Sequence, residues 1–105
     1  MVDEAGTRRM TRYRVARLAD TDLDRIWLYI ASDNVSAADR QLANLHKKFE
    51  TLAIHPDLGE SRPELASGGY RVFAAGSYVI FCRKIDDGIE IARVIHGSRD
   101  IDAVF

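Results

Sequence analysis

The stretch YRVFAAGSYVIFCRKIDDGIEIARVIH, residues 70–96, decides the fold. It contains three runs rich in β-branched and aromatic residues, at 70–74, 78–85 and 89–96, separated by short glycine-containing sequences. Ala-Gly at 75–76 and Asp-Gly at 87–88 are typical of tight hairpin turns, because glycine adopts positive φ without a steric penalty. The stretch therefore predicts an antiparallel meander of three strands.

The residues before this meander begin with a strand and continue as a helix. YRVARL at 13–18 has the composition of a short strand. Asp20 or Thr21 can cap a first helix that runs through DLDRIWLYIAS, because short polar side chains accept hydrogen bonds from the first free N–H groups. The apolar residues of this segment fall on one helical stripe.

A second helix shows the clearest periodicity in the chain. We expect Ser36 to cap it and Pro56 and Gly59 to end it. Its apolar stripe has spacings of 4, 3, 4 and 3 and consists of Ala38, Leu42, Leu45, Phe49 and Leu52. The predicted fold class is α+β, with an N-terminal strand, a two-helix hairpin and then a three-stranded antiparallel sheet.

The predicted sheet carries more apolar residues than one helical layer can cover. With two-residue turns at both glycine-containing sequences, Val72 pairs with Val79 and Phe81 with Val94. One face then carries Tyr70, Val72, Ala74, Val79, Phe81, Arg83, Ala92, Val94 and His96, and the other carries Arg71, Phe73, Tyr78, Ile80, Cys82, Ile91, Arg93 and Ile95. An antiparallel sheet with a free face normally alternates apolar and polar residues. The surplus therefore predicts a partner site on the second face.

Length and charge restrict the class of protein. A chain of 105 residues corresponds to one domain, which we place at residues 10–105 after a flexible extension at 1–9, with Met10 as an alternative start. Fifteen Lys and Arg against sixteen Asp and Glu argue against broad electrostatic binding to nucleic acid. No signal peptide and no long apolar segment is visible, so we expect a cytoplasmic protein without a membrane span.

The chain shows no pattern for a metal or a cofactor, and we expect none. His46, His55 and His96 lack the spacing of a metal site. The single Cys82 lies in an apolar run, where we interpret it as a small buried side chain rather than a catalytic thiol.

Residues 10–105 resemble a known family in the order of their motifs. Five pieces are similar to the ParE branch of the RelE/ParE toxin superfamily: the segment YRVARLADTDLDRIWLYIA with its early DL..IW.YI helix, the sequence HPDLG after the second helix, the strand GGYRVF, the hairpin GSYVIFCRKIDDGIEI and the ending RVIHGSRD. The resemblance implies a toxin of a bacterial toxin–antitoxin pair. Its partner would be a ParD-like antitoxin whose C-terminal segment wraps the toxin, and its target would be DNA gyrase.

The resemblance also supplies a cover for the second face. An antitoxin helix or strand that lies over apolar surface follows known modes of peptide recognition. The antitoxin-contact residues implied in this way are Tyr70, Val72, Val79 and Phe81, with Arg83, Arg93 and Arg99 as partners for carboxylates.

Two alternatives accompany this interpretation. The RelE-like branch cuts messenger RNA on the ribosome, with basic residues on the sheet and a terminal tyrosine. Here Val79 stands at the position of one basic residue, and Phe105, which cannot transfer a proton, stands at the end. Of the residues that the RelE-like branch uses for RNA cleavage, this chain keeps Arg99 near the expected position. The His96 side chain can in principle act as an acid or a base. We therefore predict a gyrase inhibitor with no catalytic residues and no sequence-specific binding to nucleic acid. A module that binds antitoxin without toxicity fits the apolar face equally well.

Overall fold

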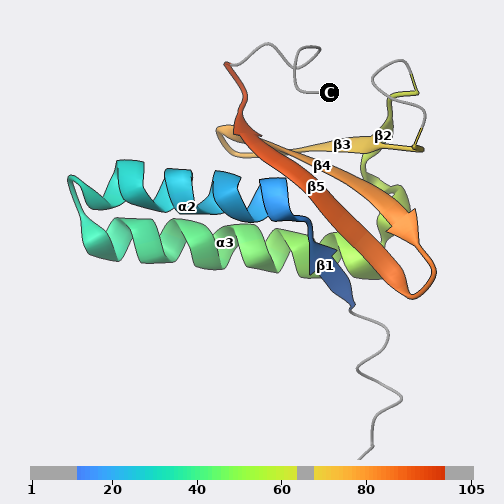
Figure 1. Cartoon of the computed structure of the whole chain (residues 1–105), viewed down its shortest axis with the longest axis horizontal. Helices are drawn as coiled ribbons and strands as arrows, with labels where there is room; N and C mark the ends of the chain where they lie inside the picture. The colour runs from blue at the N-terminus through green and yellow to red at the C-terminus, as the bar shows by residue number, and fades with distance from the viewer. Residues whose placement is uncertain (1–11, 64–67, 99–105) are drawn as a thin grey trace, which may run out of the picture.

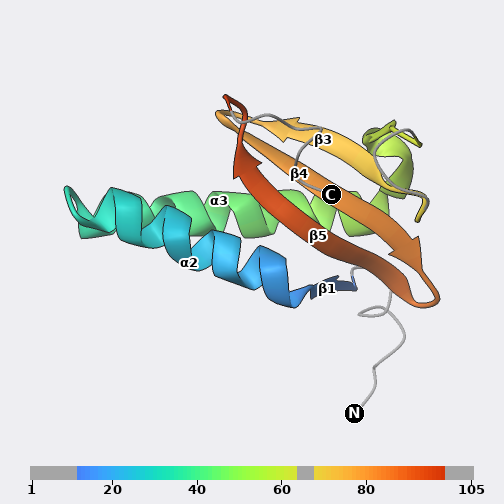
Figure 2. The same cartoon turned by 45° about the horizontal axis from the view of Figure 1, so that its top comes forward.

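The computed structural model describes residues 12–63 and 68–98. Two antiparallel helices cover one face of a five-stranded sheet with the order β1-β5-β4-β3-β2 (Figures 1 and 2). The elements are β1 (Tyr13–Val15), α2 (Arg17–Ala31), α3 (Val35–Ile54), the short 3₁₀ helix η2 (Pro56–Leu58), β2 (Glu60–Ser61), β3 (Arg71–Ala75), β4 (Tyr78–Ile85) and β5 (Gly88–His96). The predicted α+β class and element order are confirmed. The predicted strand number is wrong, because β1 and β2 join the meander at its two edges.

β1 runs parallel to β5 and leads directly into α2. The Ala16 N–H donates to the Ile91 carbonyl at 2.9 Å, and the Asp20 N–H donates to the Ala16 carbonyl at 2.9 Å. The helix therefore begins at Arg17, and the predicted cap at Asp20 or Thr21 is wrong. Gly88, with φ of +151°, is required where β1 meets β5, because a Cβ there would lie 2.4 Å from the Arg12 carbonyl oxygen.

α3 carries the apolar stripe that its sequence predicts. Its cap is Asn34 rather than Ser36, since the Asn34 side chain accepts from the Ala37 N–H at 3.0 Å. The stripe faces α2 and the sheet: Ala38, Leu45, Phe49 and Leu52 are buried, and Leu42 packs against them half-buried. The Trp27 ring N–H donates to Asp39 at 2.9 Å, which ties the two helices together.

Both hairpin turns lie one residue from their predicted positions. The pairs Ala75↔Tyr78 and Ile85↔Gly88 close the hairpins, so the turn residues are 76–77 and 86–87. Val72 consequently pairs with Phe81 rather than with Val79. The one-residue shift of the turn changes the partner of Val72 by two positions along β4. Because side chains alternate with a period of two, Val72 and Phe81 stay on the predicted face.

β5 contains one residue more than the facing part of β4. The side chains that follow this extra residue therefore point to the faces opposite to those predicted. Cys82 pairs with Ile91 and Phe81 pairs with Arg93, which leaves Ala92 as the additional residue of a β-bulge. Beyond the bulge, Val94 packs towards the helices and Ile95 towards the opposite face. The predicted faces of these two residues were therefore wrong.

The sheet has a buried apolar cluster on each of its two faces. The larger one lies between the sheet and the helices, around Leu45, Phe49, Ile80 and Ile91. The smaller one lies on the face that neither described helix covers, and its members are described below. No helix within the described residues is long and apolar enough to cross a membrane.

Candidate functional site

The face of the sheet away from the helices brings together four of the predicted contact residues. Here the second-face cluster denotes Tyr70, Val72, Val79, Phe81, Ala92 and Ile95. Val79 is 9% exposed and Phe81 0%, while Tyr70 and Val72 pack beside them half-buried. The expectation of an open apolar surface is therefore wrong at Val79 and Phe81, which are part of the protein interior.

A row of charges crosses three strands beside this cluster. Glu90 of β5 accepts from Arg83 of β4 at 3.0 Å and from Arg14 of β1 at 3.0 Å and 3.2 Å. The Arg83 guanidinium lies 5.6 Å from the centre of the Tyr70 ring, within cation–π range. Arg83 thus lies next to the second-face cluster, as predicted, but one carboxylate already neutralises part of its charge.

Arg93 lies opposite Phe81 in the β4–β5 ladder, but its guanidinium reaches α2. Its guanidinium donates to both carboxylate oxygens of Asp22, at 2.7 and 2.9 Å, and these hydrogen bonds raise the pKa of Arg93. The side chains of this pair are only 15% and 7% exposed. Arg93 thus stands beside Phe81 in the sheet, while Asp22 of α2 holds its charged group. Arg99, the last predicted contact residue, lies outside the described residues.

The other basic side chains of the described sheet also have partners. Arg12 pairs with Asp87 at 3.2 Å and Lys84 with Asp57 at 3.1 Å. The hydrogen bond from Lys84 holds the pKa of the Asp57 carboxyl below its usual range. Arg71 donates to the backbone carbonyls of Gly59 and Asp57.

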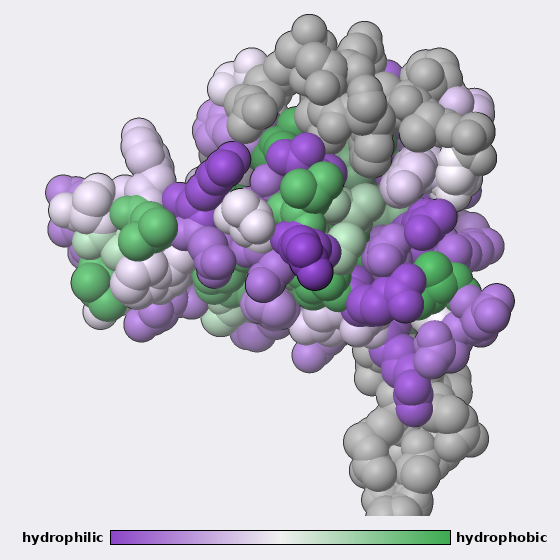
Figure 3. All heavy atoms as spheres, viewed as in Figure 1, coloured by the Kyte–Doolittle hydropathy of each residue, from purple (hydrophilic) through white to green (hydrophobic). Residues whose placement is uncertain are grey.

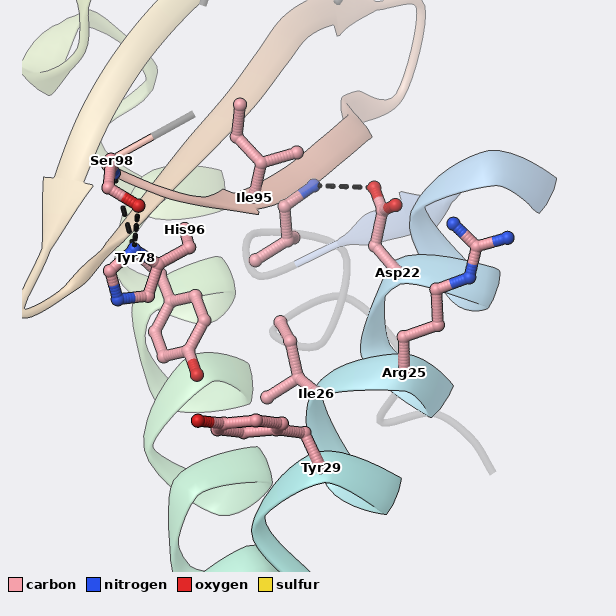
Figure 4. Close-up of a pocket in the computed structure, with 9 residues that line it drawn as sticks. Asp22, Arg25, Ile26, Tyr29, Tyr78, Ile95, His96 and Ser98 are labelled. Carbon is pink, nitrogen blue, oxygen red and sulfur yellow. Dashed lines mark hydrogen bonds between the residues drawn. The ribbon is translucent and has the colours of Figure 1, made fainter. Parts of the chain in front are cut away.

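A pocket of about 390 Å³ opens between α2 and the end of β5 (Figure 4). It is lined by Asp22, Arg25, Ile26, Tyr29, Tyr78, Val94, Ile95, His96 and Ser98. Tyr29 is 81% exposed, and Figure 4 shows its hydroxyl and that of Tyr78 pointing into the same part of the pocket. Burial raises the pKa of Tyr78, and the neighbouring Tyr29 adds to the effect.

One side of this pocket carries the imidazole of His96, whose Nδ1 is held by two hydrogen-bonding partners. His96 Nδ1 accepts from the Ser98 backbone N–H at 3.2 Å, and the Ser98 hydroxyl lies 2.8 Å from the same nitrogen. An accepting Nδ1 carries no proton, so the neutral ring bears its hydrogen on Nε2. The His96 ring also meets Tyr78 edge-to-face, with centroids 5.5 Å apart. Sequence reasoning missed this pocket because its residues come from distant segments.

The end of the helix hairpin exposes further apolar surface. Leu28 is 63% exposed and Val35 54%, and Figure 3 shows green apolar groups at this end of the molecule.

The described residues show no reactive thiol and no metal site. Cys82 is buried, which raises its pKa from 9.0 to about 11 and makes it a poor nucleophile. Within the described ranges, no group of three His, Cys, Asp or Glu side chains is placed to hold a metal ion.

Comparisons with known proteins agree with this fold. Residues 13–101 match the family described as ParE toxin of type II toxin-antitoxin system, parDE. "Toxin ParE1" of Caulobacter vibrioides is 38% identical over 95 residues, which cover 90% of this chain and 97% of the relative. "Toxin ParE1" of Mycobacterium tuberculosis is 31% identical, covering 88% of this chain and 95% of the relative.

A solved structure supports the same assignment at the level of the fold. A chain of the structure titled "Chromosomal ParDE TA system from P. aeruginosa" superposes with a TM-score of 0.68 at 21% identity, covering 84% of this chain and 97% of that one. Because the family model and relatives above 30% identity extend over most of the sequence, the chain belongs to the ParE toxin family of type II toxin–antitoxin systems.

Proposed function

We propose that this chain is a cytoplasmic toxin that inhibits DNA gyrase by protein contact and that a ParD-like antitoxin neutralises it. Membership of the ParE family supports the toxin role. The similar fold in a structure titled as a ParDE system supports an antitoxin of the ParD kind. The proposed toxin performs no bond chemistry of its own.

The main observation against the ribonuclease alternative is that three arginines of the described sheet already form ion pairs with carboxylates of the same chain. Cleavage of RNA requires cations that are available to hold phosphates and to stabilise developing charge. In the described sheet, Arg14 and Arg83 share Glu90, and Arg93 is bound by Asp22. A phosphate would have to displace these carboxylates. Inhibition by contact needs no such free set.

We also propose that the antitoxin contacts the second-face cluster. Tyr70 and Val72 are the half-buried members that a partner reaches first, and Val79 and Phe81 support them from the interior. Arg83 offers a guanidinium for a carboxylate of the partner at the rim. Arg93 and Arg99 remain in the proposed contact set as predictions, Arg93 with its charge already held by Asp22.

A gyrase assay tests the proposal. Purified chain is added to gyrase supercoiling and DNA-cleavage reactions, with and without the antitoxin encoded beside it. We expect cleaved DNA to accumulate and the antitoxin to relieve this effect. Normal gyrase activity with a tightly bound antitoxin would instead identify a binding module, and cleavage of messenger RNA in a translation extract would identify a ribonuclease.

A further inference from the structure

One side of α3 carries three cations that are not neutralised within the described part of the chain. Arg40, Asn44, Lys47 and Lys48 follow one another at spacings of 4, 3 and 1, which places them on one side of the helix, and all four are exposed. Within residues 12–63 and 68–98, none of the three cations forms an ion pair or a side-chain hydrogen bond. We call these four residues the α3 face.

The two carboxylates of α3 lie towards other elements. Asp39 accepts from the Trp27 ring N–H of α2 at 2.9 Å. Glu50 lies near Tyr13 of β1, where burial and then the charge of this carboxylate raise the pKa of the tyrosine. The helix therefore does not supply counter-charges for its own cations.

A pocket of about 350 Å³ opens beside the α3 face, where α3 meets the β3–β4 turn. Its polar side chains are those of Gln41, Asn44, Lys47 and Lys48, and it includes the exposed Gly76 of the turn. The lining thus provides two ammonium groups and two amides but no carboxylate.

This pocket differs in charge from three other pockets of the described residues. Asp22, Asp87 and Asp57 each line one of those three. Ammonium and amide N–H groups without a carboxylate suit an anion, because such donors form charge-assisted hydrogen bonds to it.

The α3 face is too long for one small anion. From Arg40 to Lys48 the helix rises by about 12 Å, at about 1.5 Å per residue. Successive phosphates of one DNA strand lie about 3.4 Å apart along the duplex axis. Amide side chains such as that of Asn44 are also common donors to phosphate oxygens. The dimensions and donors therefore match a run of phosphates.

We infer that the α3 face binds the phosphate backbone of duplex DNA, without reading its sequence, when the chain acts on gyrase. This inference rests on the proposed function, because gyrase holds the DNA that the chain would meet. No aromatic ring lines the pocket, so it offers no surface on which an unpaired base could stack. The α3 face lies on the helical side of the sheet, away from the second-face cluster that we propose for the antitoxin.

The same pocket is not equipped to cleave a nucleic acid. Its lining contains no imidazole, phenol or carboxylate, so it can hold a phosphate but has no group of this kind to move a proton. The net charge of −1 for the whole chain makes the contact local, in agreement with the absence of broad electrostatic binding.

An NMR titration of the isotope-labelled full chain tests the site. The probes are a short duplex of mixed sequence and, separately, inorganic phosphate, both at low salt. We expect the duplex to shift the side-chain amide signals of Gln41 and Asn44 and the backbone amide of Gly76. It should do so at a phosphate concentration at least about tenfold below that needed with inorganic phosphate. The ring N–H of Trp27, which is bonded to Asp39, is the internal control and should not move.

Two double variants test the role of the charges. Lys47→Glu with Lys48→Glu and Arg17→Glu with Arg25→Glu change the net charge equally, but the two arginines are exposed on α2. For the wild-type chain we expect log affinity for the duplex to fall with log salt concentration with a slope of about −2 to −3, because each neutralised phosphate contributes about −0.9.

The lysine variant should bind the duplex at least about tenfold more weakly, with a slope of about −1, and the arginine variant should keep the wild-type slope. Lys47→Arg with Lys48→Arg keeps both charges and should retain binding. In the gyrase assay, the lysine variant should also lose more of the accumulated DNA cleavage than the arginine variant.

The outcomes separate this inference from the proposed function. If the duplex leaves the α3 signals unchanged, or if the two charge-reversed variants behave alike, the inference is wrong, and the gyrase assay still decides the proposed function. If inorganic phosphate acts as well as the duplex, the face holds a single anion and the DNA contact is wrong. If the duplex binds at α3 but the wild-type chain has no effect on gyrase, DNA binding is supported and the proposed function is wrong.

Discussion

Asp22 of α2 and Arg93 of β5 form a two-point ion pair, with Nε–Oδ2 and Nη2–Oδ1 distances of 2.7 and 2.9 Å. The same Asp22 oxygen accepts from the Val94 N–H. One nearly buried carboxylate thus fixes the first helix against the last strand. It also occupies the one edge N–H of Val94, which limits how another strand can approach β5.

The first prediction concerns the stability of this pair. Asp22→Ala should lower the free energy of unfolding by about 3 kcal/mol, because it leaves a poorly solvated guanidinium and a backbone N–H without partners. Asp22→Asn combined with Arg93→Gln should cost clearly less, since no charge is left uncompensated. Urea denaturation measures both. Equal losses for the single and the double variant would contradict the assigned role of the charge.

The second prediction concerns the second-face cluster. Phe81 is 0% exposed, as is Phe49 in the core beneath the helices. Phe81→Ala should therefore destabilise the chain by about 3–5 kcal/mol, similarly to Phe49→Ala. Thermal unfolding of the two variants provides the comparison. A loss below about 1 kcal/mol at Phe81 would show that this face is not part of the stabilising interior.

This burial also decides which substitutions can test antitoxin binding. Phe81→Asp would place a charge in the interior, so lost binding would report unfolding as much as a lost contact. Tyr70 and Val72 are half-buried, and substitutions there test the proposed contact more directly.

The elements with strong local signals were predicted from the sequence. The glycine-containing turns and the stripe of α3 depend on residues close together in the chain, and both lie where expected to within one or two residues. Tyr70, Val72, Val79 and Phe81 were placed on one face because side chains alternate along a strand, whichever turn residue closes the hairpin.

Features that depend on pairing between distant segments were not predicted. β2 has two residues, too few to give a pattern, and exists because β3 offers it an edge. The bulge at Ala92 leaves no mark in the alternation of IEIARVIH, yet it exchanges the faces of Val94 and Ile95. Asp22 looks like an ordinary first-turn acid, and its partner Arg93 lies 71 positions away. The pocket on α2 and β5 was missed for the same reason.

The third prediction concerns the reactivity of Cys82. Burial keeps the thiol protonated, with a pKa of about 11. We expect a disulfide reagent at pH 8 to leave the native chain unmodified for as long as it stays folded and to react at once in denaturant. Rapid modification of the native chain would show that the strand around Cys82 opens readily.

The same pKa shift has a consequence for stability at high pH. The pKa is raised on folding from 9.0 to about 11, so the contribution of the thiol is fully present below about pH 9 and is lost as the pH rises towards 11. Urea midpoints of the wild-type chain and Cys82→Ala, measured from pH 8 to 11, should converge over this range. Comparison with the variant removes the effect of all other groups, because both proteins contain them. Parallel curves would show that Cys82 does not titrate differently in the two states.

The fourth prediction concerns Arg83 as a contact for the antitoxin. Its side chain is 37% exposed, holds only one oxygen of Glu90 and stacks near Tyr70, so a carboxylate of the partner has access to its remaining donors. Arg83→Ala should weaken antitoxin binding by about tenfold, and Arg83→Lys should recover only part of the loss because lysine lacks the planar fork.

Calorimetric titration of the antitoxin against these variants provides the measurement, with Arg40→Ala on α3 as the control for a lost exposed arginine. Because Arg83 also bonds to Glu90, each variant is first shown to unfold at a urea concentration close to that of the wild-type chain. Equal affinities for Arg83→Ala and Arg40→Ala, in folded protein, would remove Arg83 from the contact surface. The antitoxin would then engage the chain through other residues, and substitutions at the half-buried Tyr70 and Val72 would decide whether the second-face cluster is still part of the contact.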